Sequence, residues 1–112
     1  EMRLNMDKLR EAGVTVKALR ATGGGARSKV WMQMKADILN IPVTALRSEE
    51  AGAAGSAMLV GIAVGAFANL EEAARIMVVP RDTYYPRQDV HDQYESTYRR
   101  YTKVYNAVRP LV

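Results

Sequence analysis

The chain has no cysteine, and its 112 residues include one histidine, one tryptophan and one phenylalanine. The absence of cysteine excludes a disulfide framework and a cysteine-ligated metal site, and it is typical of proteins in the reducing cytoplasm. His91 stands between Asp89 and Asp92, but side chains two positions before and one position after do not share its helical face. We therefore expect no metal site, and we expect His91 to be a solvated residue near a helix start.

The first residues, EMRLNMDKLREAG, have neither the basic start nor the apolar run of a signal peptide. Polar and apolar residues alternate there at helical spacing from the outset. We therefore expect the sequence to begin inside a helix and to be a piece of a longer protein. The formal net charge is +4 with a pI near 9.6. Sixteen basic residues are spread along the chain among twelve acidic ones, which indicates a solvated surface and not a nucleic-acid-binding face.

One long stretch is poor in polar residues, at positions 51–67. A membrane span is the rival interpretation, because Gly61 and Gly65 have the G-x-x-x-G spacing of packed membrane helices. The stretch is, however, at the low end of spanning length. We therefore predict a buried helix over residues 49–67, whose glycines let another element pack closely, and no membrane association.

The remaining periodicities predict an α/β protein with few strands and several helices. Gly13 is a typical C-terminal stop for the first helix, Asn40 and Pro42 end the second, and Asn69 caps a short later helix. The predicted elements are a helix at 2–13, a buried strand at 14–22, a helix at 26–39, a strand at 42–48, the helix at 49–67, a short helix at 69–77, a loop at 78–88 and a long helix at 89–109.

Two side chains of the 26–39 helix are candidates for special roles. Trp31 shares one predicted face with Val30, Met34 and Ile38. We expect this tryptophan to pack in the core beneath the preceding glycines, since tryptophan is mostly buried. Asp37 could serve as a base, but a structural hydrogen bond is the favoured interpretation.

Tyrosines follow a 4-3-4-3 spacing in the last helix and form one stripe: Tyr94, Tyr98, Tyr101 and Tyr105, continued by Val108. The favoured interpretation is a docking face, so Tyr98 and Tyr101 are expected to be largely buried against this chain or its parent. A stacking platform for single-stranded nucleic acid is the weaker alternative.

Three consecutive glycines, Gly23, Gly24 and Gly25, lie between the predicted strand and the 26–39 helix. Glycine lets a ligand approach the backbone because no Cβ stands in the way, and a helix N-terminus attracts anions. The order strand, glycines, helix thus indicates either a nucleotide site or a plain turn, and geometry alone favours neither. The glycines match no common phosphate fingerprint, because a G-x-G-x-x-G motif needs glycine where Ser28 stands and a Walker A loop needs a downstream Gly-Lys pair.

Three segments together resemble the C-terminal lobe of the FGGY carbohydrate kinases, with the xylulokinase-like members closest in style. They are GGGARSKVWMQMKADILNIPV, EEAGAAGSAMLVGIAVG and the Y-x-x-x-Y-x-x-Y of the tail. The resemblance covers essentially the whole chain, in order and spacing. It implies the C-terminal part of an actin-like ATPase (ribonuclease H-like) domain. It also implies ATP-dependent phosphorylation of a sugar or polyol hydroxyl, with Mg²⁺.

In that family the Gly-Gly-Gly-Ala-x-Ser element binds adenosine, and the small-residue helix packs behind it. By resemblance, Gly24, Gly25 and Ala26 match the part of the motif that lies against the nucleotide, and Gly23 is expected to be a nucleotide-binding residue with them. Ser28 and Lys29 match the helix start that can reach the base or ribose. Glu50 matches an acidic position of structural role at the front of the small-residue helix.

No residue here matches the family's phosphate loop or its general-base aspartate, so no catalytic residue is assigned. We expect residues 1–112 to be the C-terminal nucleotide-binding lobe piece of a sugar kinase and to be inactive alone. ATP and a sugar or polyol, held mainly by an upstream lobe, are the expected partners, and a homo-oligomer is left open. The alternative function is a stand-alone interaction module that docks a partner through its tyrosine-faced helix.

Overall fold

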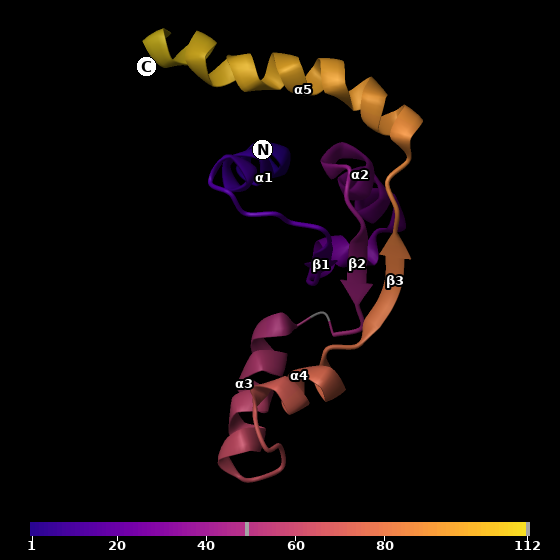
Figure 1. Cartoon of the computed structure of the whole chain (residues 1–112), viewed down its shortest axis with the longest axis vertical. Helices are drawn as coiled ribbons and strands as arrows, with labels where there is room; N and C mark the ends of the chain where they lie inside the picture. Colours follow the sequence, from indigo (N-terminus) through magenta and orange to yellow (C-terminus); the bar gives the residue numbers. More distant parts are fainter. Residues whose placement is uncertain (49, 112) are drawn as a thin grey trace.

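A computed structural model describes residues 1–48 and 50–111 of the chain. The fold is α/β, and the order of elements is shown in Figure 1. Those elements are α1 Met2–Glu11, β1 Leu19–Ala21, the 3₁₀ helix η1 Gly24–Arg27, α2 Lys29–Leu39, β2 Val43–Leu46, α3 Ala51–Ala63, α4 Leu70–Met77, β3 Pro80–Tyr84, α5 Gln88–Val108 and the 3₁₀ helix η2 Arg109–Leu111.

The described strands form one sheet in the order β1-β2-β3. β1 and β2 are parallel, with Leu19 opposite Val43, and α2 makes the crossover that parallel strands require. β3 runs antiparallel to β2, with Thr44 opposite Thr83. The sheet occupies the middle of the molecule, α5 crosses one end above α1 and α2, and the α3–α4 pair forms the other end (Figure 1).

The core lies between α2 and the sheet. Its fully or nearly fully buried members are Ala26, Met32, Ala36, Val43 and Ala45, and a second cluster joins α1 to the end of α2 through Met6, Leu39 and Ile41. Small residues dominate the first cluster, so the helix approaches the strands closely. The glycine-rich segment is anchored to this core by Ala26.

The predicted buried face of α2 is wrong. Val30 is 71% exposed and Trp31 is 50% exposed, whereas Met32, Ala36 and Leu39 face the sheet and α1. The helix carries apolar residues on two neighbouring stripes, and the stripe that contains Ala36 allows the closer contact with the sheet. Trp31 lies at the surface instead, with the Lys35 ammonium 5.8 Å from its ring centroid.

Two predicted boundaries also differ from the structure. The strand predicted at 14–22 is limited to Leu19–Ala21, and the loop predicted at 78–88 contains β3. Proline is tolerated at the first position of an edge strand, and Pro80 occupies that position, so β3 forms by pairing with β2. Other local predictions are confirmed: Asn40 ends α2 in the left-handed region, and the Asn69 side chain caps α4 by accepting from the Glu72 amide.

The small-residue helix α3 is not buried within this chain, contrary to prediction. Leu59, Val60 and Val64 are 60–74% exposed, because α3 packs on α4 at the far end of the molecule and not behind the glycines (Figure 1). Gly61 does permit close packing, since a Cβ there would lie 2.6 Å from the Phe67 ring. No helix in the described ranges is long and apolar enough to cross a membrane.

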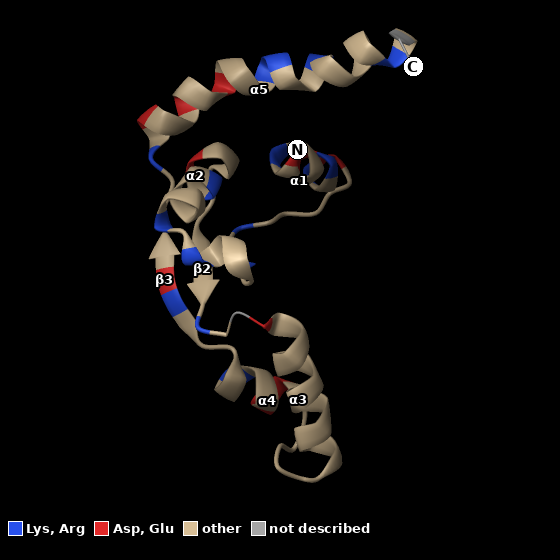
Figure 2. Cartoon of the chain, turned by 180° about the vertical axis from the view of Figure 1, so that it is seen from behind, with Lys and Arg blue, Asp and Glu red and all other residues tan. Residues whose placement is uncertain are grey.

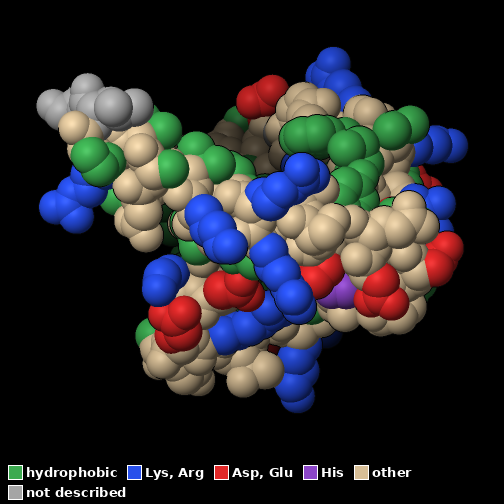
Figure 3. Space-filling model, turned by 90° about the horizontal axis from the view of Figure 1, so that it is seen from above, with side chains coloured by type: hydrophobic (Ala, Val, Ile, Leu, Met, Phe, Trp, Pro, Cys, Tyr) green, Lys and Arg blue, Asp and Glu red, His purple; other side chains and the backbone are tan. Residues whose placement is uncertain are grey.

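The long helix α5 extends past the body of the chain. Tyr94 and Tyr98 are partly buried near α2 and α1, whereas Tyr101 is 41% and Tyr105 is 71% exposed. The predicted burial of Tyr101 is therefore not found within this chain, because the helix outruns the surface that covers its first half. Acidic residues occur near the start of α5 and basic residues further along it (Figure 2). Basic and acidic side chains lie next to each other on the face of the molecule that is seen from above (Figure 3).

Candidate functional site

The glycines form the connection between β1 and α2, as predicted, but α2 begins at Lys29 and not near Ala26. Gly23 has φ +80°, a backbone conformation that side chains other than glycine rarely adopt. The Ala26 amide donates to the Gly23 carbonyl at 2.9 Å, which closes the first turn of η1. The positive φ therefore explains why position 23 is glycine, but it does not explain the glycines at positions 24 and 25.

Gly24 is exposed and has open space around it. A Cβ built on Gly24 would meet nothing within 4 Å, whereas one on Gly25 would lie 3.5 Å from Cδ1 of Trp31. The backbone at Gly24 is thus freely approachable from solvent, and the indole of Trp31 borders the neighbouring position. A flat ligand can lie against this backbone without meeting a side chain of Gly24.

The other predicted site residues have distinct surroundings. The Ala26 side chain is 4% exposed and belongs to the core, so only its backbone is available to a ligand. Ser28 is the N-cap of α2, and its Oγ accepts a hydrogen bond from the Trp31 amide at 3.2 Å. Lys29 is exposed in the first turn of α2. Ser28 and Lys29 therefore lie at the N-terminal end of α2, where the helix dipole is positive. Gly24 lies in η1, which directly precedes this helix end.

Sequence reasoning missed a residue that contacts this turn. Arg81, in β3, donates from Nη2 to the carbonyl oxygen of Ala26 at 2.9 Å. The two residues are 55 positions apart, and Arg81 falls in the segment predicted to be a loop. No local pattern in the sequence could have found this contact.

Asp37 makes the structural hydrogen bonds predicted for it, at the junction of α2 and α5. Its carboxylate is buried, and it accepts from Nη2 of Arg87 at 2.6 Å, from the Arg87 amide at 2.8 Å and from Nε2 of Gln33 at 2.9 Å. Burial raises the pKa of Asp37, but the hydrogen bonds from Arg87 and Gln33 outweigh it and hold the pKa below its ordinary value. An anionic carboxylate that accepts all these hydrogen bonds holds α2 against the start of α5 and does not act as a base.

His91 is not the solvated residue that was predicted. Its ring is partly buried, and Nδ1 lies 2.8 Å from the backbone oxygen of Asp37. A protonated Nδ1 can donate to that oxygen, so His91 adds to the junction of α2 and α5. Among the described residues no three His, Cys, Asp or Glu side chains gather as metal ligands.

Comparison with known proteins identifies the architecture. The sequence model of the C-terminal domain of the FGGY family of carbohydrate kinases matches residues 1–64. This chain belongs to the FGGY family. The fold is accordingly that of the C-terminal part of an actin-like ATPase domain.

FGGY relatives match nearly the whole chain. It is 34% identical to the xylulose kinase of Bacillus subtilis over 96% of this chain and 21% of that protein. It is 34% identical to the L-xylulose/3-keto-L-gulonate kinase of Escherichia coli over 94% of this chain and 21% of that protein. The crystal structure of xylulose kinase from Rhodospirillum rubrum superposes with a TM-score of 0.80 at 26% identity, over 98% of this chain and 22% of that one. The chain spans about a fifth of the length of these relatives.

Two further expectations have different outcomes, one for the alternative function and one for Glu50. Membership gives no support to the alternative of a stand-alone interaction module. Glu50, expected to be structural at the front of the small-residue helix, is the N-cap residue of α3, but its side chain makes no capping hydrogen bond.

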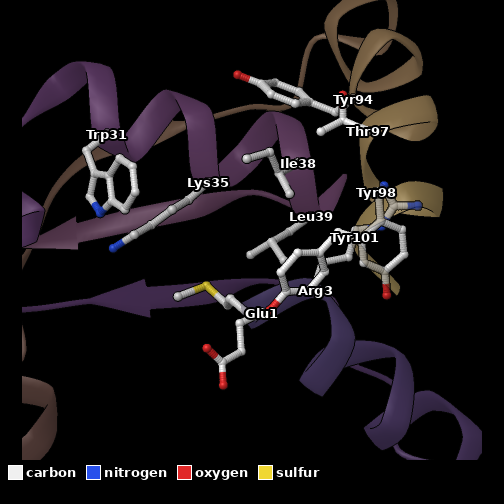
Figure 4. Close-up of a pocket in the computed structure, with 11 residues that line it drawn as sticks. Glu1, Arg3, Trp31, Lys35, Ile38, Leu39, Tyr94, Thr97, Tyr98 and Tyr101 are labelled. Carbon is white, nitrogen blue, oxygen red and sulfur yellow. The ribbon is translucent and has the colours of Figure 1, made fainter. Parts of the chain in front are cut away.

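A hollow lies between α1, α2 and α5 (Figure 4). It begins beside the glycine turn, because Trp31 and Lys35 line it and both lie within 4 Å of a Cβ built on Gly25. Its volume is about 440 Å³, and Ile38, Leu39 and Tyr101 line it. At its border Tyr98 donates a hydrogen bond to Asp7, and the Arg3 guanidinium lies 4.0 Å from the Tyr98 ring centroid. These contacts tie the last helix to the first.

The Tyr98 contact makes a testable prediction for alkaline pH. Burial raises the pKa of the Tyr98 phenol, and the hydrogen bond to Asp7 and the charge of that carboxylate raise it further, to about 12. Because this pKa lies above the ordinary 10.0, the stability due to the protonated phenol is complete below pH 10 and is lost as pH rises to about 12. An ultraviolet titration of tyrosinate should show one late-ionising tyrosine, which Tyr98→Phe abolishes. The exposed control Tyr105→Phe should leave the late step in place, and a late step that survives Tyr98→Phe would contradict the contact.

Proposed function

We propose that this chain is the C-terminal portion of a cytoplasmic, ATP-dependent carbohydrate kinase, and that its glycine turn lines the adenosine side of the ATP cleft. The observation that carries this proposal is the freely approachable backbone of Gly24 at the junction of β1 and α2. FGGY membership supplies the reaction class. A plain turn would need glycine only at Gly23, where φ is positive.

Each residue of the turn has a separate proposed role in binding the nucleotide. The backbone of Gly24 offers a surface without a side chain, on which the flat adenosine part of the nucleotide can lie. The Ser28 hydroxyl keeps its proton available while Oγ accepts from Trp31, so it can donate to the ribose or base. Lys29 is a mobile point charge at the edge. When bound, ATP supplies the phosphoryl group that is transferred.

In residues 1–48 and 50–111 no group of three carboxylate or imidazole side chains gathers as metal ligands, so none of these residues is assigned to Mg²⁺. We therefore place Mg²⁺, the phosphates and the sugar with the rest of the kinase. The general base that takes the proton of the sugar hydroxyl is likewise placed there. The present chain binds and orients the nucleotide, and alone it is inactive.

The acceptor is a sugar or polyol hydroxyl. Xylulose and L-xylulose are the first candidates, because relatives named for these substrates match 94–96% of this chain. Glycerol is a second candidate, since the glycerol kinase of Lactococcus lactis is 34% identical over 88% of this chain.

A coupled assay of ADP release tests the proposal on the full-length protein that contains this chain. ATP should yield ADP only when an acceptor is present, and at least one of D-xylulose, L-xylulose and glycerol should serve. Residues 1–112 alone should give no more ADP than a blank without enzyme. Full-length protein that binds no ATP would contradict the proposal, and so would turnover by residues 1–112 alone.

A further inference from the structure

The strand β3 contains an irregularity at Arg81. Along the β2–β3 pairing Ala45 lies opposite Asp82, but the next residue of β2, Leu46, lies opposite Pro80. Arg81 is thus the extra residue of a β-bulge, with no partner position on β2. Bulges turn a side chain away from the regular alternation of a strand, and they are frequent beside functional sites.

The bulge directs the Arg81 side chain toward the glycine turn. Its Nη2 donates to the Ala26 carbonyl oxygen at 2.9 Å, and its Nε donates to the neighbouring Asp82 carboxylate at 3.1 Å. The guanidinium is held by Asp82 on one side and holds the turn on the other. The side chain is 34% exposed, so its aliphatic stem and head lie at the surface beside the turn and not in the core.

The hydrogen bond from Arg81 holds the Ala26 carbonyl, which the hydrogen bonding of η1 leaves free. The Ala26 amide is bonded to Gly23 within η1, whereas the Ala26 carbonyl points out of η1 to Arg81. Because a peptide unit is planar, holding this carbonyl also sets the direction of the Arg27 amide. Glycine-rich backbone has many accessible conformations, and a long-range hydrogen bond restricts them.

We propose that Arg81 is a positioning residue for nucleotide binding, which acts by holding the Ala26 carbonyl and so keeps the backbone of Gly24 in its binding conformation. This inference rests on the proposed function of the turn. It adds a residue from β3, at the other edge of the described sheet from β1, and it gives the bulge in β3 a role. Arg81 contacts the turn and not the reacting groups.

Steady-state kinetics of the full-length kinase test this role. Arg81→Met keeps the length of the side chain but removes the donors, and it should raise the KM for ATP about three- to tenfold, the range expected for one partly exposed, charge-assisted hydrogen bond. The KM for the sugar should stay near wild type. Arg81→Lys retains one donor group and should give an intermediate KM for ATP. The matched control is Arg75→Met, on the exposed surface of α4, and it should change neither constant.

Hydrogen exchange of residues 21–27 supplies a readout independent of activity, and Arg81→Met should accelerate it. An unchanged KM for ATP in folded Arg81→Met protein overturns the inference. If Gly24→Val still raises that KM, the proposed function survives and only the role of Arg81 falls. If exchange accelerates while neither variant changes the KM for ATP, the turn is not part of the nucleotide site, and both proposals fall. If Arg81→Met does not fold, Arg81→Lys is the test variant. The inference is then overturned if Arg81→Lys has the same hydrogen exchange of residues 21–27 and the same KM for ATP as wild type.

Discussion

Replacing Gly24 by valine should raise the KM for ATP of the full-length kinase about ten- to a hundredfold, the range expected for a steric conflict of a few methyl groups. The reason is the open space at this position: a Cβ meets nothing within 4 Å, so the new side chain disturbs only a ligand that lies there. Gly24 lacks the positive φ of Gly23, so valine does not strain the backbone. The KM for the sugar and the melting temperature should stay close to wild type.

Neighbouring positions give a graded comparison. Gly25→Val should also raise the KM for ATP, but the result is harder to interpret because the new side chain would contact Trp31, which lies 3.5 Å from the added Cβ. Lys29→Ala should have a smaller effect, since a flexible lysine is a point charge at the edge of the site. The matched control is Gly52→Val, where a Cβ also meets open space. An unchanged KM for ATP in folded Gly24→Val protein would leave the glycines as a plain turn.

Removing the Asp37 carboxylate should lower the free energy of unfolding of the chain by about 2–3 kcal/mol, because it breaks several hydrogen bonds of one buried charged group. The expected decrease in the free energy of unfolding is small for a buried ion pair, because the Arg87 side chain is 57% exposed and can be solvated by water after the substitution. The Arg87 amide and the Gln33 amide group lose their shared acceptor. Urea unfolding of Asp37→Ala, followed by Trp31 fluorescence, measures the effect. The exposed control Asp89→Ala should change the midpoint little.

The same variant has a predicted pH dependence. The pKa of Asp37 lies below its ordinary 3.8 in the folded chain, so its contribution to stability is complete above about pH 4 and is lost as pH falls through the folded value. The difference between wild type and Asp37→Ala should therefore be constant from neutral pH to about pH 4 and shrink below it. A difference that grows on acidification would contradict an ionised, hydrogen-bonded Asp37.

Local patterns predicted the parts of this fold that depend on a few adjacent residues. The glycine connection, the Asn69 cap and the end of α2 at Asn40 follow from backbone conformation and capping, which short sequences determine. The structural role of Asp37 was also predictable, because the Gln-x-x-x-Asp spacing places Gln33 and Asp37 on one helical face, and the two side chains are hydrogen-bonded at 2.9 Å. The family resemblance then indicated the use of the glycines, which geometry alone left open.

Contacts between distant segments account for what the sequence did not predict. β3 exists because β2 pairs with it, and the bulge that turns Arg81 toward Ala26 exists only in that pairing. The exposed position of Trp31 depends on which apolar stripe of α2 fits the sheet. The exposure of α3 follows because α3 packs mainly on α4. Residue spacing within a helix gives candidate faces but does not choose among them.

Photolabelling of the full-length kinase with 8-azido-ATP tests the central claim most directly, because the azide sits on the adenine ring. After trypsin digestion, the label should lie in the peptide of residues 21–27, which contains all three glycines of the turn, and excess ATP should prevent labelling. Gly24→Val should reduce the label at equal reagent concentration. ATP-protected label found only outside residues 21–35 would contradict the account and place the adenine elsewhere on the kinase.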